Sequence, residues 1–331
     1  MAEVTGLVLP FFGLILLGFI AARITKQPEI AMGWLNTFII YLALPALFFK
    51  LLAKTPIEQL ASWGFVTANV SATFVIFALG FAIANRVLRS GIADSTIQGL
   101  AGAYGNIGYM GPGLAILTFG EKAAVPVALI FCFENIMHFT VAPTLMAIAG
   151  GNRDDEADGK SGGVSALIKG VVRRIVFHPF IIATAFGVAA AVLDVTPPLP
   201  VDRLIGYLAQ AAAPCALFAM GVILALRPLK RAPVELTFIV PLKLLVHPVV
   251  MYVALGWAGD FDPVWVYTAV LLAALPTATN VFVIGQQYGV WVERASATIL
   301  VTTVVSVLSV SALLYAITSG ILPADLFPGS L

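Results

Sequence analysis

The sequence is poor in charged residues. Only 11% of its 331 residues are charged and 60% are hydrophobic, whereas a soluble domain carries about 25% charged residues. The mean hydropathy is +1.00. This balance excludes an ordinary soluble domain and predicts an integral membrane protein.

The sequence also lacks several motifs, and their absence excludes some classes of function. The net charge is only +1, and no basic cluster with interleaved aromatic residues occurs, so nucleic acid is not an expected partner. The two cysteines, Cys132 and Cys215, lie in apolar segments and have neither disulfide nor metal-ligand spacing. The sequence has no Gly-Xaa-Ser-Xaa-Gly motif, no paired intramembrane aspartates and no metal triad. We therefore expect no metal, no cofactor and no enzyme, and an intramembrane hydrolase is only a remote alternative.

Long apolar runs are abundant. Segments of about 20 residues suit a bilayer core of about 30 Å. Ten such segments are expected at 4–23, 33–53, 63–86, 96–119, 123–149, 172–193, 202–226, 233–257, 264–288 and 292–319. All five tryptophans fall at the expected ends of these spans, where aromatic rings settle at the headgroup level. The expected fold is an all-α polytopic membrane protein with ten transmembrane helices.

The loops predict how these spans are oriented. Lys and Arg are concentrated in the loops that follow the odd-numbered spans, and such loops face the cytoplasm. Both termini are therefore expected outside the cytoplasm. The polar, Gly-rich segment 150–170 is expected to be a flexible cytoplasmic linker. It separates five spans in 1–149 from five spans in 171–331, and an odd number of spans per half makes the repeat inverted.

The fourth and ninth spans are interrupted at corresponding positions. The first interruption contains Gly105, Gly111 and Pro112, and Pro276 interrupts the second. Within hydrocarbon, backbone groups freed from a helix persist only where they face protein or a polar cavity. Two matched breaks in an inverted repeat point to the binding site of a secondary transporter.

Polar side chains at the breaks are candidates for binding a substrate. A carboxamide such as Asn106 or Asn280 can donate to a carboxylate, and the half-helix N-termini beside it favour an anion. The alternative is that each amide only satisfies the broken backbone. The candidate substrate-binding residues are Asn106, Tyr109, Lys243, Thr277, Thr279 and Asn280.

Lys243 lies deep in the eighth span, about 15 Å along the helix from Pro233. An ionisable residue at that depth suggests a function. It could place positive charge beside the breaks in place of a sodium ion, attract an anion, or exchange protons. The alternative is a structural ammonium that binds backbone carbonyls freed by the breaks.

Three further titratable residues are candidates for proton coupling. Glu134 and His138 are four residues apart in the fifth span and therefore share one helix face. Glu134 could take up protons and His138 could relay them. His247, one turn beyond Lys243, could line the same cavity. Equally, Glu134 could neutralise Lys243, or the Glu134–His138 pair could form a polar contact between helices.

Five segments, in this order, resemble the auxin efflux carrier family, in particular the bacterial branch of malonate-carrier-like permeases. They are 35–49 (LNTFIIYLALPALFF), 106–112 (NIGYMGP), 220–225 (MGVILA), 243–248 (KLLVHP) and 274–280 (ALPTATN). The resemblance implies that the broken fourth and ninth helices cross near the midplane. It implies a scaffold of spans one, two, six and seven, a transport core of the other six, an elevator-like movement and a homodimer.

The sequence thus predicts a secondary active transporter of a small organic anion, a mono- or dicarboxylate, in the plasma membrane. The main alternative is a sodium-coupled organic-anion symporter of the bile-acid type, which has a similar ten-span architecture. Such a symporter needs carboxylates at the crossing, whereas these breaks offer amides and hydroxyls. A receptor that does not transport remains a further alternative.

Overall fold

The computed structural model describes residues 2–53, 55, 61–150, 173, 177, 179–226 and 233–324. Within these ranges the regular structure is helical, and a single isolated β-bridge is present. The expected all-α class is confirmed. The predicted linker 150–170 lies outside the described residues except for Gly150.

Six helical stretches are long and apolar enough to cross a membrane: Ile30–Leu52, Trp63–Val87, Glu121–Ile148, Leu199–Leu226, Leu236–Ala258 and Val292–Thr318. Two of these stretches combine two elements: Trp63–Val87 is α5 (Trp63–Ala82) with η3 (Ile83–Val87), and Glu121–Ile148 is η4 (Glu121–Ala123) with α8 (Ala124–Ile148). Two others are single helices, α11 (Leu199–Leu226) and α16 (Val292–Thr318). The first expected span corresponds to α1 (Ala2–Thr25), and the sixth to the shorter α10 (Pro179–Val192).

The fourth and ninth expected spans are each two short helices. The fourth consists of α6 (Ile92–Ala103) and α7 (Gly111–Phe119), and the ninth of α14 (Pro263–Ala274) and α15 (Thr279–Tyr288). Pro112 lies in the first turn of α7 and lacks the N–H that a continuous helix requires, and Pro276 lies between α14 and α15. The predicted helix breaks are therefore present.

Two other spans contain wide turns just before a proline. In the second, η1 (Glu29–Met32) and α2 (Gly33–Phe38) lead into a π-helical turn, η2 (Ile39–Ala43), before α3 (Leu44–Leu52). In the eighth, α12 (Leu236–Pro241) leads into the π turn η6 (Leu242–Val246) before α13 (His247–Ala258). Proline cannot donate to the helix and crowds the preceding turn, and an inserted residue relieves this conflict. The turn η6 carries Lys243.

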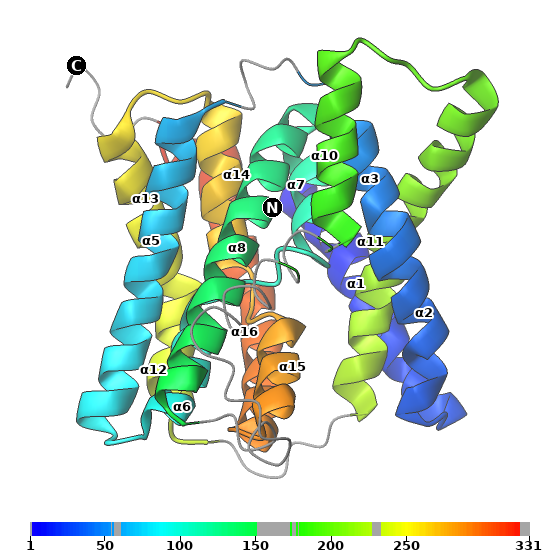
Figure 1. Ribbon diagram of the computed structural model, residues 1–331. Coiled ribbons are helices and arrows are strands. Elements are labelled where there is room, and N and C mark those ends of the chain that lie inside the picture. Colours follow the sequence, from blue (N-terminus) through cyan, green and yellow to red (C-terminus); the bar gives the residue numbers. More distant parts are fainter. Residues whose placement is uncertain are drawn as a thin grey trace.

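The helices form two neighbouring groups. In Figure 1, α1, α2, α3, α10 and α11 lie together on the right-hand side, and the remaining labelled helices lie on the left and centre. The closest crossing is between α1 and α11. A Cβ atom added to Gly18 would lie 2.1 Å from the Phe218 carbonyl oxygen, and one added to Gly221 would lie 1.9 Å from that of Ile15. Small residues thus let these two backbones touch, as is common in membranes.

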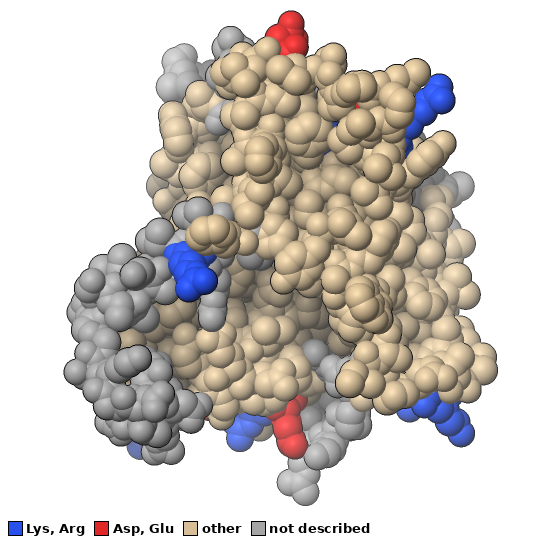
Figure 2. Space-filling view, turned by 45° about the vertical axis from the view of Figure 1, so that its right-hand side comes forward, with Lys and Arg blue, Asp and Glu red and all other residues tan. Residues whose placement is uncertain are grey.

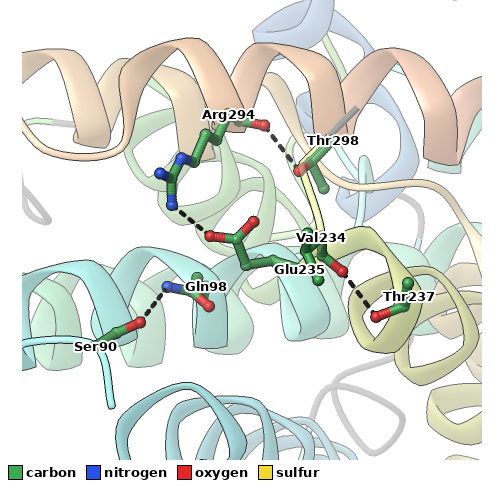
Figure 3. A network of polar contacts seen from close by, with 7 residues as sticks. All are labelled: Ser90, Gln98, Val234, Glu235, Thr237, Arg294 and Thr298. Carbon is green, nitrogen blue, oxygen red and sulfur yellow. Dashed lines mark hydrogen bonds and ion pairs between the residues drawn. The ribbon is translucent and has the colours of Figure 1, made fainter. Parts of the chain in front are cut away.

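Polar contacts occur on three helices of the other group at one end of the molecule (Figure 3). Arg294 of α16 donates to the carboxylate of Glu235, which precedes α12. Thr298 donates to the Arg294 carbonyl at 2.8 Å. Nearby, the buried Gln98 of α6 donates to the Ser90 hydroxyl at 3.2 Å. The ion pair links α16 to the start of α12 below the broken segments, whereas the other two bonds are local to α16 and to the start of α6.

The surface fits a lipid environment. Figure 2 shows one face that is almost wholly uncharged, with Lys, Arg, Asp and Glu mostly near its upper and lower ends. Many large hydrophobic side chains are exposed along the helices, for example Leu308 of α16 at 76% and Tyr207 of α11 at 70%. Exposed apolar surface of this extent is costly in water and is expected in a bilayer.

Candidate functional site

The two breaks pair with each other. Gly105 and Thr277 form an antiparallel β-bridge. The Asn106 N–H donates to the Pro276 carbonyl at 2.8 Å, and the Ala278 N–H donates to the Tyr104 carbonyl at 2.9 Å. Backbone groups that leave their own helices at one break are thus satisfied by the other break, as a low-dielectric environment requires.

Two side chains bind the carbonyl ends of the half-helices that lead into the breaks. Thr277 donates to the Ala101 carbonyl of α6 at 2.7 Å. Lys243 donates to the Ala273 carbonyl of α14 at 2.6 Å. A cation at the C-terminal end of α14 also complements the negative end of the helix dipole. Both residues are fully buried and are absent from the lining of the cavity described next.

A cavity of about 70 Å³ lies against the paired breaks. On this scale one water needs only ~10–15 Å³, so the space suits a small polar molecule or a few waters. It is lined by Ile40, Leu44, Tyr104, Gly105, Asn106, Ile107, Gly108, Tyr109, Phe131, Asn135, Phe180, Ala278, Thr279 and Asn280. The lining therefore combines three carboxamides and two phenols with apolar side chains, and it contains no carboxylate.

The first turn of α15 forms one wall of the cavity. Ala278, Thr279 and Asn280 all line it, and Ala278 is the extended residue that precedes the helix. The first N–H groups of a helix have no acceptor within the helix and carry partial positive charge. This wall is therefore suited to a negatively charged group.

A chain of hydrogen bonds fixes the polar side chains of the cavity. Asn280 Nδ2 donates to the Tyr104 hydroxyl at 2.7 Å, and that hydroxyl donates to Asn135 Oδ1. Asn135 Nδ2 in turn donates to the Phe131 carbonyl at 2.7 Å. The carboxamide of Asn280 is thus held by Tyr104 of the first break, which is itself fixed by Asn135 of α8, and this preorganises it for a ligand.

Tyr104 and Asn135 were not predicted as site residues. Tyr104 lies within the first break, and Asn135 follows Glu134 in the fifth span. Both are polar residues in apolar surroundings, which is the only signal that the sequence offers. Their contact with Asn280, 176 residues from Tyr104 in the chain, is made by the fold alone.

Some of the other predicted residues at the breaks line the cavity and some do not. Tyr109 and Thr279 line the cavity. Asn106 also lines it, and its amide nitrogen lies 3.0 Å from the Met220 sulfur of α11, so this side chain reaches the neighbouring helix group. Gly111, Pro112 and Pro276 shape the breaks but are not part of the lining.

Lys243 lies directly behind the first break. Its Nζ is 3.0 Å from His247 Nδ1 and 3.1 Å from the point where a Cβ on Gly105 would stand. Because Gly105 itself lines the cavity, only the backbone of this glycine lies between the ammonium and the cavity. The bond to the Ala273 carbonyl fits a cap for a freed carbonyl, and a role of the charge in binding stays a prediction.

Glu134 and Lys243 are connected through two other side chains. Thr73 of α5 donates to Glu134 Oε1 at 2.8 Å, and its hydroxyl is 3.2 Å from His247 Nε2. His247 contacts Lys243 through its other ring nitrogen. No ion pair joins these two described residues, so Glu134 does not pair directly with Lys243.

His138 takes a different place from the other titratable residues. Its ring stacks on Tyr104 with centroids 4.0 Å apart, and the side chain is fully buried. Neither of its ring nitrogens has a hydrogen-bond partner within the described part of the chain. His138 thus touches the cavity network through the Tyr104 ring rather than through a hydrogen bond.

The arrangement is a candidate solute-binding site. No group of three or more His, Cys, Asp or Glu side chains that could hold a metal occurs in the described ranges. The features present are a buried polar cavity, two bonded helix breaks and a buried charge behind them. Such a combination is typical of secondary transporters.

Comparison with known proteins agrees with this class. Residues 3–314 match the family model described as "Membrane transport protein", so the chain belongs to this family, and the expected relation to auxin efflux carriers is confirmed. The protein is therefore a multi-pass membrane transporter and not an enzyme.

Two relatives cover nearly the whole chain. A protein of Rhizobium meliloti (strain 1021) named "Putative malonate transporter" is 67% identical over 328 residues, which is 99% of this chain and 100% of the relative. An "Uncharacterized transporter" of Methanothermobacter thermautotrophicus is 24% identical over 307 residues, or 92% of this chain and 95% of the relative.

Proposed function

We propose that this protein is a secondary active transporter of a small organic anion, a short mono- or dicarboxylate, in the plasma membrane. It has ten spans arranged as a 5+5 inverted repeat in which the helices α6–α7 and α14–α15 cross. The carrying observation is the cavity at the paired breaks, whose polar lining is made of carboxamides and phenols together with the first turn of α15.

The chemistry of this lining favours an anion. Asn280 and Asn106 can present N–H donors, and the α15 N-terminus adds partial positive charge. A sodium site needs several oxygen ligands, among which carboxylates neutralise the charge, and the residues that line the cavity include no acid. The sodium-coupled alternative is disfavoured for this reason.

The size of the cavity favours a short substrate. About 70 Å³ leaves little room beyond a compact anion, and Phe131 and Phe180 wall it with apolar rings. The name of the Rhizobium relative makes malonate the first compound to test. One carboxylate lies at the first turn of α15, and a second lies near Asn106.

Lys243 acts on the substrate through its field rather than by direct contact. Its ammonium lies behind Gly105, within the same low-dielectric interior as the cavity. Charges in such surroundings interact far more strongly than in water. The lysine thereby offsets the charge of a bound anion without being exposed to it.

Proton coupling uses the chain of contacts from Glu134 through Thr73 and His247 to Lys243. Each member contacts the next by a hydrogen bond, so a proton can be exchanged between carboxylate, imidazole and ammonium. His138, stacked on Tyr104, lies beside this chain and is available as a further proton acceptor.

The bonds between the two breaks determine which helices move together when the substrate is carried across the membrane. Because the two breaks are tied by their backbones, α6–α7 and α14–α15 move together as one core against a scaffold of α1, α2–α3, α10 and α11. On the side where α8 begins, Phe131 of the core packs on Phe48 and Phe180 of the scaffold, with centroids 5.1 and 4.6 Å apart. This aromatic contact closes the cavity toward the outside, and an elevator-like displacement of the core opens it.

Uptake of radiolabelled malonate into proteoliposomes tests the proposal. The panel includes acetate, succinate and citrate, and separate runs impose a proton, a sodium or a voltage gradient. We expect saturable malonate uptake that a proton gradient drives without sodium. Strict dependence on sodium favours the bile-acid type instead, and binding without flux identifies a receptor.

Three variants locate the site and the coupling. Asn280→Ala is expected to abolish binding and flux, whereas Asn85→Ala, which removes a carboxamide that binds Ser90 outside the cavity, is a matched control. Glu134→Gln is expected to lose uptake driven by a proton gradient but to retain malonate exchange across the membrane. Unchanged flux in Asn280→Ala contradicts the proposed site, and unchanged proton-driven uptake in Glu134→Gln contradicts the coupling.

The orientation and the homodimer are separate parts of the proposal. Both termini outside the cell and a cytoplasmic segment 150–170 follow from the distribution of Lys and Arg. Single-cysteine labelling from each side of the membrane tests this orientation. Cross-linking between scaffold helices in native membranes tests the homodimer.

A further inference from the structure

A second hollow lies between the two helix groups, away from the polar cavity. It has a volume of about 400 Å³ and is lined by Phe19, Arg23, Leu224, Leu300, Val301, Val304 and Val305. These residues come from α1, α11 and α16. Six of the seven are hydrophobic, and Arg23 is the only charged residue among them.

The hollow opens to the surroundings of the helices. Val304 is 62% exposed and Val305 is 37% exposed, whereas Leu224 at its back is buried. Since α11 and α16 are membrane-spanning candidates and α1 packs on both, a bilayer around these helices would reach this opening. Hydrocarbon chains, rather than water, are the material available to fill an apolar groove there.

Arg23 provides the second observation. It lies in the last turn of α1, and its guanidinium carbon is 5.3 Å from the centre of the Phe19 ring. In the described part of the chain it has no ion-pair partner. A guanidinium that lies over an aromatic face still has its N–H groups free at the edge to bind a phosphate in a bidentate manner.

We propose that this groove binds an anionic phospholipid. Its acyl chain lies along Leu300, Val301 and Val304, and its phosphate group is bound by Arg23. The charge distribution of the loops places this end of α1 at the cytoplasmic leaflet, where anionic headgroups are available and basic residues attract them. The occupant joins α1 and α11 of one helix group to α16 of the other.

Binding is measured on the intact protein by native mass spectrometry in detergent. The probes are phosphatidylglycerol and phosphatidylcholine with identical acyl chains. We expect a retained adduct with phosphatidylglycerol and a weaker one with phosphatidylcholine. Arg23→Gln is expected to weaken phosphatidylglycerol binding about fivefold, the effect of one basic residue near a headgroup. It should leave phosphatidylcholine binding unchanged.

A second variant tests the groove itself. Val304→Trp fills it and is expected to remove the retained adduct of both lipids. Val249→Trp is its matched control, because this valine of α13 is 60% exposed but lies outside the groove. Arg86→Gln, an exposed arginine in η3, is the control for the charge.

A photoactivatable phosphatidylglycerol provides a readout that does not depend on any variant. Cross-linked peptides are expected from α1 around Arg23 and from α16 around Val304. The proposal is overturned if the two lipids bind equally well, if both arginine variants behave alike, or if the cross-links fall elsewhere. All of these measurements are independent of transport, so they stand or fall separately from the proposed substrate.

Discussion

Replacement of Lys243 by Met tests how the buried charge is balanced. Methionine keeps most of the length of the side chain but removes the donors to the Ala273 carbonyl and to His247. Lys243 is fully buried. Lys243 is linked to Glu134 through His247 and Thr73. Without the ammonium, Glu134 is a buried acid that has no nearby cation.

Two magnitudes distinguish the possible outcomes. An ordinary hydrogen bond between membrane helices contributes about 0.6 kcal/mol on average and about 1.7 kcal/mol at most. Removing one partner of a directly bonded buried charge pair costs about 3–5 kcal/mol, since the other charge is left uncompensated. Glu134 and Lys243 are joined only through Thr73 and His247, so this figure is an upper bound for Lys243. We therefore expect Lys243→Met, which also removes the donors to Ala273 and His247, to lower the free energy of unfolding by about 2–5 kcal/mol.

The assay is equilibrium unfolding in mixed detergent micelles, followed by circular dichroism and tryptophan fluorescence. The double variant Lys243→Met/Glu134→Gln removes both charges and is expected to recover at least about 1 kcal/mol relative to the sum of the single variants. Lys50→Met, at a half-buried lysine near the end of α3, is the control and should change stability by less than about 1 kcal/mol. A loss below about 1.7 kcal/mol for Lys243→Met, with no coupling to Glu134, would refute the reasoning.

Two further predictions concern the cavity and the helix crossing. Tyr104→Phe removes the hydroxyl that orients Asn280, so we expect KM for uptake to rise about tenfold while stability falls by only about 1 kcal/mol; an unchanged KM would show that this orientation does not matter. Gly221→Ala places a Cβ 1.9 Å from the Ile15 carbonyl oxygen and should prevent normal packing of α1 on α11, seen as loss of the monodisperse peak in size-exclusion chromatography. Gly6→Ala, where no atom lies within 4 Å of the new Cβ, should behave like the original protein, and equal behaviour of both glycine variants would contradict the close crossing.

The sequence predicted the helical segments well because hydrophobic runs and helix breakers are local signals. Within the described residues each expected span overlaps one helix or a consecutive set of helices, and six of them are long and apolar enough to cross a membrane. The breaks at Pro112 and Pro276 were equally readable, since each proline removes a donor within an apolar run. The pairing of the breaks by their backbones was not predicted, because it joins segments about 170 residues apart.

The site was only partly predictable, because the position of a residue along a helix does not show in which direction its side chain points. Lys243 was expected near the breaks from its distance along the helix, but the π turn η6 sets the direction of its side chain. The structure places it behind Gly105 instead of in the cavity lining. Similarly, the fifth span contains Glu134, Asn135 and His138, and only the packing of α8 shows that Asn135 is the member that lines the cavity.

The bridge between the breaks also bears on how the protein is made. During synthesis the chain up to α8 is made before Pro276 and Ala278 exist, so the Asn106 N–H and the Tyr104 carbonyl lack their final partners at that stage. Unsatisfied backbone groups within hydrocarbon cost several kcal/mol each. The early half is therefore an incomplete intermediate that the arrival of the late half must complete. A ribosome stalled after the first half should leave a product that membrane proteases remove, and co-expression of the missing half should rescue it.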